Sequence, residues 1–121
     1  MKTLLALAAV LPLCVLAAQP TPAALAEIDH LMSYIAHSDC RFYRNGSWHG
    51  MDEARAHVST KYEWLRDRGQ VATAEEFIEG AASRSSLSGE DYKVQCPGGS
   101  EQSTGPWLKA ELRRFRATPP G

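Results

Sequence analysis

Two cysteines, Cys40 and Cys96, constrain the fold of this chain more than any other feature of its sequence. The chain contains three cysteines, but Cys14 lies in an N-terminal segment that we expect to be removed. The two that remain allow a single pairing, and their wide separation excludes the Cys-x-x-Cys motifs of redox and zinc sites. An even count favours a disulfide in an exported protein, whereas both would stay free thiols in a reducing compartment. We predict one Cys40–Cys96 disulfide.

The N-terminal segment has the three parts of a secretory signal peptide. Lys2 supplies a positive charge, residues 4–16 form an apolar run, and the small residues Ala17 and Ala18 follow. A run of about 13 residues is too short for a bilayer core that needs roughly 20, which favours cleavage over a membrane anchor. We expect residues 1–18 to be cleaved. The product is then exported, with no stable membrane insertion.

The composition is typical of a globular protein. Hydrophobic residues make up 44% of the chain and charged residues 22%, which excludes disordered, collagen-like and coiled-coil proteins. Thirteen basic and fourteen acidic side chains give a net charge of -1, so no basic excess draws the molecule onto nucleic acid. Residues 19–121 are long enough for one small domain and too short for two.

Hydrophobic periodicity predicts an α+β fold that is mainly α. Apolar residues recur at three- and four-residue spacing in four segments, and short β-favouring runs surround Cys40 and Cys96. We expect about four helices and a short two-stranded antiparallel sheet stapled by one disulfide. The expected helices are residues 22–37, 52–68, a segment capped by Thr73 and Glu76, and residues 107–116. The expected strands are residues 40–45 and 91–96, and residues 97–105 form a turn-rich connection.

The cysteines also suggest a register for the two strands. If they face each other in an antiparallel sheet, every second residue falls on one face, as the strand period requires. Arg44 then lies opposite Tyr92, where its guanidinium can stack on the ring. The Asn45-Gly46 turn comes close to the serine-rich Ser85–Gly89 loop. The opposed pairs are Cys40–Cys96, Phe42–Val94 and Arg44–Tyr92.

Five ordered blocks of sequence resemble the YfeK-like family of small exported bacterial proteins, a domain-of-unknown-function family. The resemblance spans residues 25–115 and implies an exported, periplasmic bacterial protein. The resemblance identifies no catalytic residues in this chain. The blocks are Cys40 to Gly46 with Phe42 and Arg44, Thr73 to Ile78, Ser85 to Tyr92, Cys96 to Gly98, and Trp107-Leu108.

The sequence offers no strong metal or cofactor site, and we expect neither ligand. His30 and His37 lie seven positions apart, whereas a metal clip on one helix needs four-residue spacing, so both are expected on a solvated helix face. The serines of the 83–88 region lack a Gly-x-Ser-x-Gly elbow. The basic residues Arg113, Arg114 and Arg116 suit the C-terminus of a helix, whose dipole they complement.

Two functions remain open, and the sequence favours the one that is not enzymatic. The first is a non-catalytic binding module for a protein or small ligand in the cell envelope. The second is a weak hydrolase that combines the serine loop with a histidine brought in by the fold. Arg44 is the expected anchor for an anionic or carbonyl-bearing group, although it could instead only brace the serine loop. The candidate binding residues are Arg44, Asn45, Ser85, Ser86, Gly89 and Tyr92.

Overall fold

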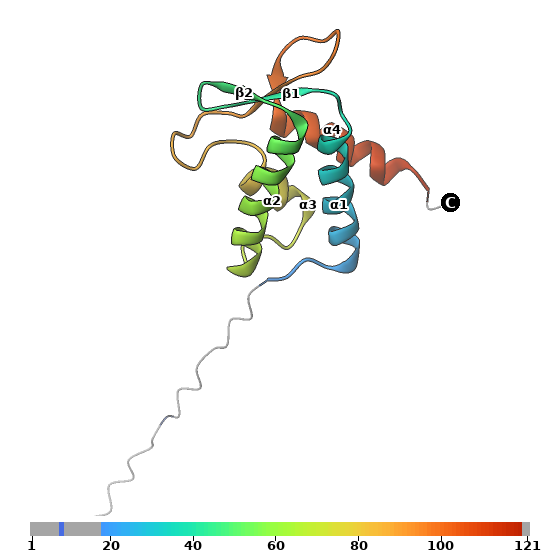
Figure 1. Ribbon diagram of the computed structural model, residues 1–121. Helices are drawn as coiled ribbons and strands as arrows, with labels where there is room; N and C mark the ends of the chain where they lie inside the picture. The colour runs from blue at the N-terminus through green and yellow to red at the C-terminus, as the bar shows by residue number, and fades with distance from the viewer. Residues whose placement is uncertain (1–7, 9–17, 120–121) are drawn as a thin grey trace, which may run out of the picture.

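The computed structural model describes residue 8 and residues 18–119, which form four helices and a four-stranded sheet (Figure 1). The helices are α1 (Pro22–Ala36), α2 (Met51–Asp67), α3 (Ala74–Ala81) and α4 (Thr104–Ala117). The strands are β1 (Arg41–Arg44), β2 (Ser47–His49), β3 (Lys93–Gln95) and β4 (Gln102–Ser103). The α+β class and its helical majority are confirmed. The expected signal peptide and Cys14 lie outside the described residues, apart from Ala8 and Ala18.

The hydrophobic core lies among the four helices, and the sheet covers one end of it. α1 and α2 lie side by side, and the β1–β2 hairpin crosses the end where α1 stops and α2 begins (Figure 1). The apolar stripes predicted from periodicity face inward, and burial of each large side chain contributes about 1.5–3 kcal/mol. The largest fully buried side chains include Ile28, Leu31, Ile35, Phe77, Ile78 and Leu108.

Helix α4 begins at Thr104 rather than at the predicted Trp107. The sequence pattern was misleading because Pro106 falls just before the apolar stripe. The first four amides of a helix have no partner within the helix, so a proline in the first turn costs no hydrogen bond. The early start buries Thr104 and Gly105 against the rest of the molecule.

The sheet has four antiparallel strands in the order β2-β1-β3-β4, not the two that were predicted. The two additional strands are short and lie at the edges. β2 follows the Asn45-Gly46 turn, in which both residues have positive φ, 47° and 89°. A two-residue turn of this kind matches the twist of antiparallel strands, and it returns the chain as a hairpin with Arg44 opposite Ser47.

The predicted register between the two central strands is confirmed. Phe42 lies opposite Val94, and the flanking pairs are Arg41–Gln95 and Tyr43–Lys93. Extending this register places Cys40 opposite Cys96, and these two residues form the disulfide with their Cα atoms 4.0 Å apart. At the other end the same register brings the ends of β1 and β3 together, and the candidate site lies there.

Helix α3 begins with the predicted capping box. The Thr73 hydroxyl accepts a hydrogen bond from the amide of Glu76 at 3.1 Å. The Glu76 carboxylate in turn accepts from the amide of Ala72 and from the Thr73 hydroxyl. The amide of Glu76 in the first turn and the amide of Ala72, just before the cap, are thereby satisfied.

Replacing Thr73 by alanine should lower the free energy of unfolding by about 1 kcal/mol, because the amide of Glu76 loses its acceptor. Chemical denaturation measures the change. Thr73→Ser keeps the acceptor oxygen and should retain most of the stability. An unchanged midpoint for Thr73→Ala would show that the cap contributes nothing.

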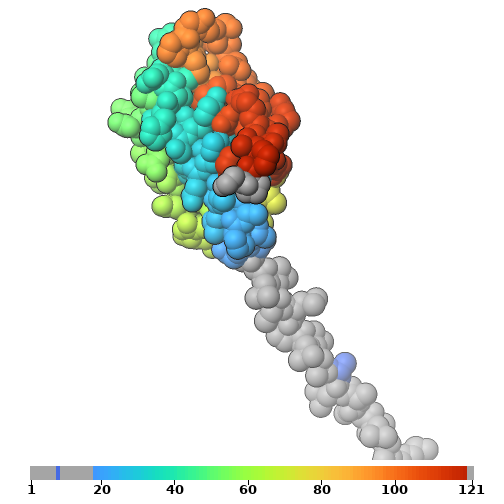
Figure 2. Space-filling view, turned by 90° about the vertical axis from the view of Figure 1, so that its right-hand side faces the viewer, coloured from blue at the N-terminus to red at the C-terminus, as the bar shows by residue number. Residues whose placement is uncertain are grey.

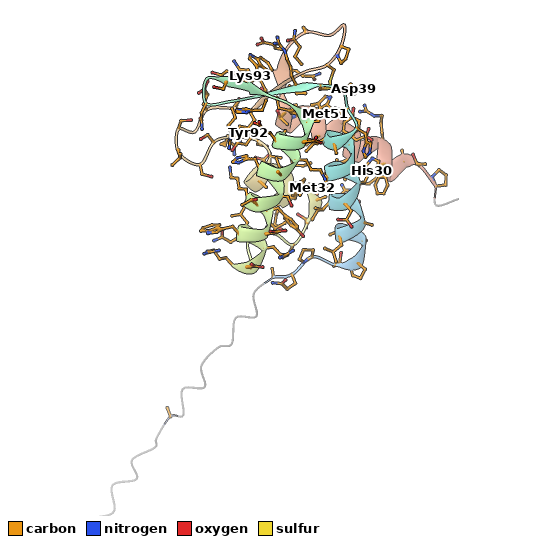
Figure 3. The ribbon with its side chains drawn as sticks, in the orientation of Figure 1. His30, Met32, Asp39, Met51, Tyr92 and Lys93 are labelled. Atoms are coloured by element: carbon orange, nitrogen blue, oxygen red, sulfur yellow. A yellow bond between two sulfur atoms is a disulfide. The ribbon has the colours of Figure 1, made fainter. Side chains whose placement is uncertain are left out.

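Helices α1 and α4 lie side by side (Figure 2), and their contact corrects two expectations about charged residues. His30 is only partly exposed (Figure 3), because its ring stacks on Phe115 at 4.2 Å and its Nε2 lies 2.7 Å from a Glu111 oxygen. The C-terminal arginines of α4 do more than complement its dipole. Arg114 bonds Glu111, and Arg116 reaches Glu27 of α1 and Glu75 of α3. Over the described part of the chain, no group of three or more potential metal ligands occurs.

Candidate functional site

The ends of β1 and β3 meet α2 at His57, a histidine that was not among the candidate binding residues. Arg44, the last residue of β1, places Nη1 2.6 Å from Nδ1 of His57. The opposite ring nitrogen, Nε2, lies 3.1 Å from the hydroxyl of Tyr92, which directly precedes β3. In Figure 3, Tyr92 lies beside α2 and below the β1–β2 hairpin. Arg44 and Tyr92 are therefore close, as predicted, with His57 linking their polar ends.

The cation over the Tyr92 ring is Lys61, not the predicted Arg44. Lys61 Nζ lies 5.1 Å from the ring centroid, and it also donates to the Tyr92 hydroxyl at 3.3 Å and to the carbonyl of Arg84 at 2.7 Å. His57 and Lys61 project from the same side of α2 because they are four residues apart. We call Arg44, His57, Lys61 and Tyr92 the basic cluster.

Hydrogen-bonding chemistry fixes the protonation state of His57. A guanidinium can only donate, so Nδ1 must carry a lone pair to accept from Arg44. The ring proton then sits on Nε2 and is donated to the Tyr92 oxygen. That oxygen accepts from both His57 and Lys61, which leaves its own O–H free to donate to a further group. All the spare hydrogen-bonding capacity of the basic cluster is therefore donor capacity.

The electrostatics agree with this assignment. Burial, followed by the charges of Arg44 and Lys61, holds the pKa of His57 below its ordinary value of 6.5. Burial raises the pKa of Tyr92, so the phenol keeps its proton at neutral pH. Burial and then the charge of Arg84 lower the pKa of Lys61.

Acidification from about pH 7.5 to about pH 5.5 should destabilise the protein through His57. The pKa of His57 is lower in the folded protein than in the unfolded chain, so below 6.5 the unfolded chain binds more protons. Stability then falls until the pH reaches the folded pKa. Urea unfolding of the wild type and of His57→Gln across this range measures the effect. Equal pH dependence in the two proteins would contradict it.

A narrow cleft adjoins the basic cluster, between the inner face of the β1–β2 hairpin and α2. Its volume of about 30 Å³ is enough for a group of a few atoms. Apolar side chains form one part of the wall and polar groups the other. The apolar residues are Ile35, Phe42, Ala54, Val58 and Ala82, and the polar or aromatic ones are Tyr43, Arg44, His49, Glu53, His57, Tyr92 and Thr104.

The basic cluster has little negative charge near it. Among residues 18–119, neither Arg44 nor Lys61 lies within 4.0 Å of a carboxylate oxygen. The nearest acid in the wall, Glu53, is bonded instead to His49 at 2.6 Å, and its side chain is largely exposed. Arg44 in the cleft wall and Lys61, which lies against Tyr92, therefore have no carboxylate partner.

The serine loop meets the Asn45-Gly46 turn, as the register predicted, and Asn45 makes the contact. Its side-chain oxygen accepts a hydrogen bond from Ser88 at 2.9 Å. The Ser85 hydroxyl is turned into the loop, where it accepts from the amides of Leu87 and Ser88. Ser86 and Gly89 are exposed on the same loop. Of the six candidate binding residues, Arg44 and Tyr92 line the cleft, while Asn45, Ser85, Ser86 and Gly89 lie outside its wall.

Residues 22–116 match the model of a family of unknown function, DUF5329. The chain belongs to this family. The match includes every helix and strand described above except the last residue of α4, and it contains the whole basic cluster.

One curated protein is similar to part of this chain. The uncharacterized protein YfeK of Salmonella typhimurium is 38% identical over 68 residues, which are 55% of this chain and 55% of YfeK. The chain therefore spans about half the length of the curated relative that it matches. No solved structure gives a significant match.

Sequence reasoning missed three residues of this site, namely His57, Lys61 and Thr104. For the first two a signal existed, because Glu53, His57 and Lys61 follow one another at four-residue spacing on one side of α2. For Thr104 there was none, because its burial results from the early start of α4.

Proposed function

We propose that this member of DUF5329 is a non-catalytic binding module whose cleft takes an anionic group of a ligand. One observation carries the proposal. Arg44 and Lys61 meet at His57 and Tyr92 beside the cleft, and no carboxylate in the described part of the chain pairs with either cation. Every free hydrogen-bonding position of the basic cluster is a donor, and donors facing a cleft favour an acceptor with negative charge.

The contacts of the serine loop support binding rather than hydrolysis. A serine nucleophile needs a base within hydrogen-bond reach of its oxygen. The Ser85 oxygen instead braces its own loop by accepting two backbone amides. The ring nitrogens of His57 are both engaged, one with Arg44 and the other with Tyr92. The bracing of the loop needs no contribution from Arg44, because Asn45 provides the bond to the loop.

The setting of this module is part of the same proposal. The signal-peptide pattern of residues 1–18 supports export to the bacterial periplasm or medium, so the ligand or protein partner would lie in the cell envelope. With a net charge of -1, the protein has no excess of positive charge that would attract nucleic acid as a partner. Within the residues that the structure describes, no helix is long and apolar enough to span a membrane.

Nuclear magnetic resonance titration of the protein with acetate and with inorganic phosphate, at constant ionic strength, tests the proposal. We expect at least one anion to shift the amide resonances around Arg44, His57 and Tyr92. Arg44→Gln should weaken that binding by about ten-fold or more, because a charge-assisted hydrogen bond is lost. Arg113→Gln is the matched control, since Arg113 is exposed and lies outside the cleft.

Two results would overturn the proposal. In the first, neither anion shifts the resonances of the basic cluster. In the second, Arg113→Gln weakens binding as much as Arg44→Gln, which would indicate a general charge effect rather than a site.

A further inference from the structure

The hydroxyl of Thr104 is a buried polar group without a partner. Thr104 is 3% exposed, and its Oγ1 is one of two buried side-chain oxygens in residues 18–119 that lack a hydrogen bond. Its amide donates a hydrogen bond to the carbonyl of Tyr92 at 2.9 Å, so the hydroxyl is the group that lacks a hydrogen-bond partner. Native proteins seldom bury such a group, because its hydration is lost without compensation. Valine would fill the same space without this penalty.

Thr104 belongs to the wall of the same cleft as Arg44. The two residues come from different parts of the chain, one from the start of α4 and the other from the end of β1. A group bound in the cleft would therefore lie beside both Arg44 and Thr104. A bound group would give the Thr104 hydroxyl the hydrogen-bond partner that the protein alone does not provide.

The size and the lining of the cleft restrict the kind of anion. A volume of about 30 Å³ admits one small group and leaves any larger part of a ligand outside. Most of the exposed surface of the wall is apolar, and the side chains of Phe42 and Val58 are both buried. A phosphate is hydrated on all sides and would lose water to this apolar wall. A carboxylate on an aliphatic carbon presents oxygens to one part of the wall and carbon to the other.

We propose that the group bound in this cleft is an aliphatic carboxylate, held by the guanidinium of Arg44 and the hydroxyl of Thr104. This inference rests on the proposed function and makes it specific. A free short-chain acid and the C-terminal end of a peptide both supply such a carboxylate.

The experiment compares propionate, inorganic phosphate and propionamide as probes at constant ionic strength, with binding read from amide resonances. Propionamide has the shape of propionate without its charge. We expect propionate to bind more tightly than either of the other probes. N-acetyl-alanyl-alanine, which ends in a free carboxylate, is the fourth probe. A higher affinity for this peptide than for propionate would assign a peptide end as the source, and the reverse would assign a free acid.

Thr104→Val and Thr104→Ser separate a ligand contact from a structural role. Thr104→Val should weaken propionate binding by about ten-fold, through loss of a hydrogen bond to a charged group. Its melting temperature should stay the same or rise, because an unpartnered hydroxyl is removed. Thr104→Ser keeps the hydroxyl and should bind propionate within a few-fold of the wild type.

The outcomes distinguish this inference from the function on which it rests. Tighter binding of phosphate than of propionate would overturn the inference and leave the anion-binding function standing. Wild-type affinity of Thr104→Val for propionate would also overturn it, because the hydroxyl would then make no contact. If no anion binds, both proposals fall.

Discussion

Replacing Cys40 and Cys96 together by alanine should lower the free energy of unfolding by about 4 kcal/mol. The disulfide closes a loop across a sequence separation of 56 residues, and in the chain-entropy account the unfolded state regains that freedom when the link is cut. For a domain of this size the melting temperature should fall by about 15 °C or more. Thermal and urea unfolding of the double variant measure both quantities.

The same link positions the cleft, because it joins β1 to β3 at the end opposite Arg44 and Tyr92. The wild type should have a mass about 2 Da below that of the dithiol, and its two cysteines should resist alkylation until they are reduced. The matched comparison is the wild type treated with a reducing agent, which should lose as much stability as the double variant. A loss below about 1 kcal/mol would contradict the prediction.

Replacing Phe77 by alanine should cost about 3–5 kcal/mol, the range for deleting a fully buried aromatic side chain. Phe77 lies at the centre of α3 with none of its surface exposed, and its ring meets Tyr62 of α2 edge to face at 5.5 Å. Removing the ring leaves a cavity between two helices that the backbone cannot close.

Leu87→Ala provides the control for this prediction. Leu87 is 95% exposed on the serine loop, so its truncation should change stability by less than about 0.5 kcal/mol. Chemical denaturation of both variants measures the difference. Comparable losses for the two would show that α3 does not anchor the core. Phe77→Leu keeps much of the volume and should lie between the two.

The basic cluster draws its residues from three places: the end of β1, one partly buried side of α2 and the segment before β3. The Thr104 hydroxyl adds a fourth, at the start of α4. None of these positions is close to another in the sequence, apart from His57 and Lys61. The scaffold that the disulfide and Phe77 stabilise is therefore the condition for any binding in the cleft, and the two predictions above test that scaffold.

Local patterns were sufficient for much of the fold. The apolar stripes of α1 and α2, the capping box of Thr73 and the Asn45-Gly46 turn each depend on residues within a few positions of one another. The register of β1 on β3 followed from one additional constraint. Strand side chains alternate with a period of two, so a disulfide at one pair fixes which residues are opposed at every other pair. Phe42 accordingly lies opposite Val94.

The tertiary structure alone decided the edge strands and which residues join Arg44 and Tyr92 at the site. β2 and β4 have three and two residues, too few for a period to be recognised, and they form because a central strand offers free backbone groups beside them. His57 lies between Arg44 and Tyr92 because the hairpin crosses the start of α2, a packing arrangement that no short-range pattern encodes. The burial of Thr104 likewise depends on how α4 packs, since the environment of a hydroxyl is set by distant parts of the chain.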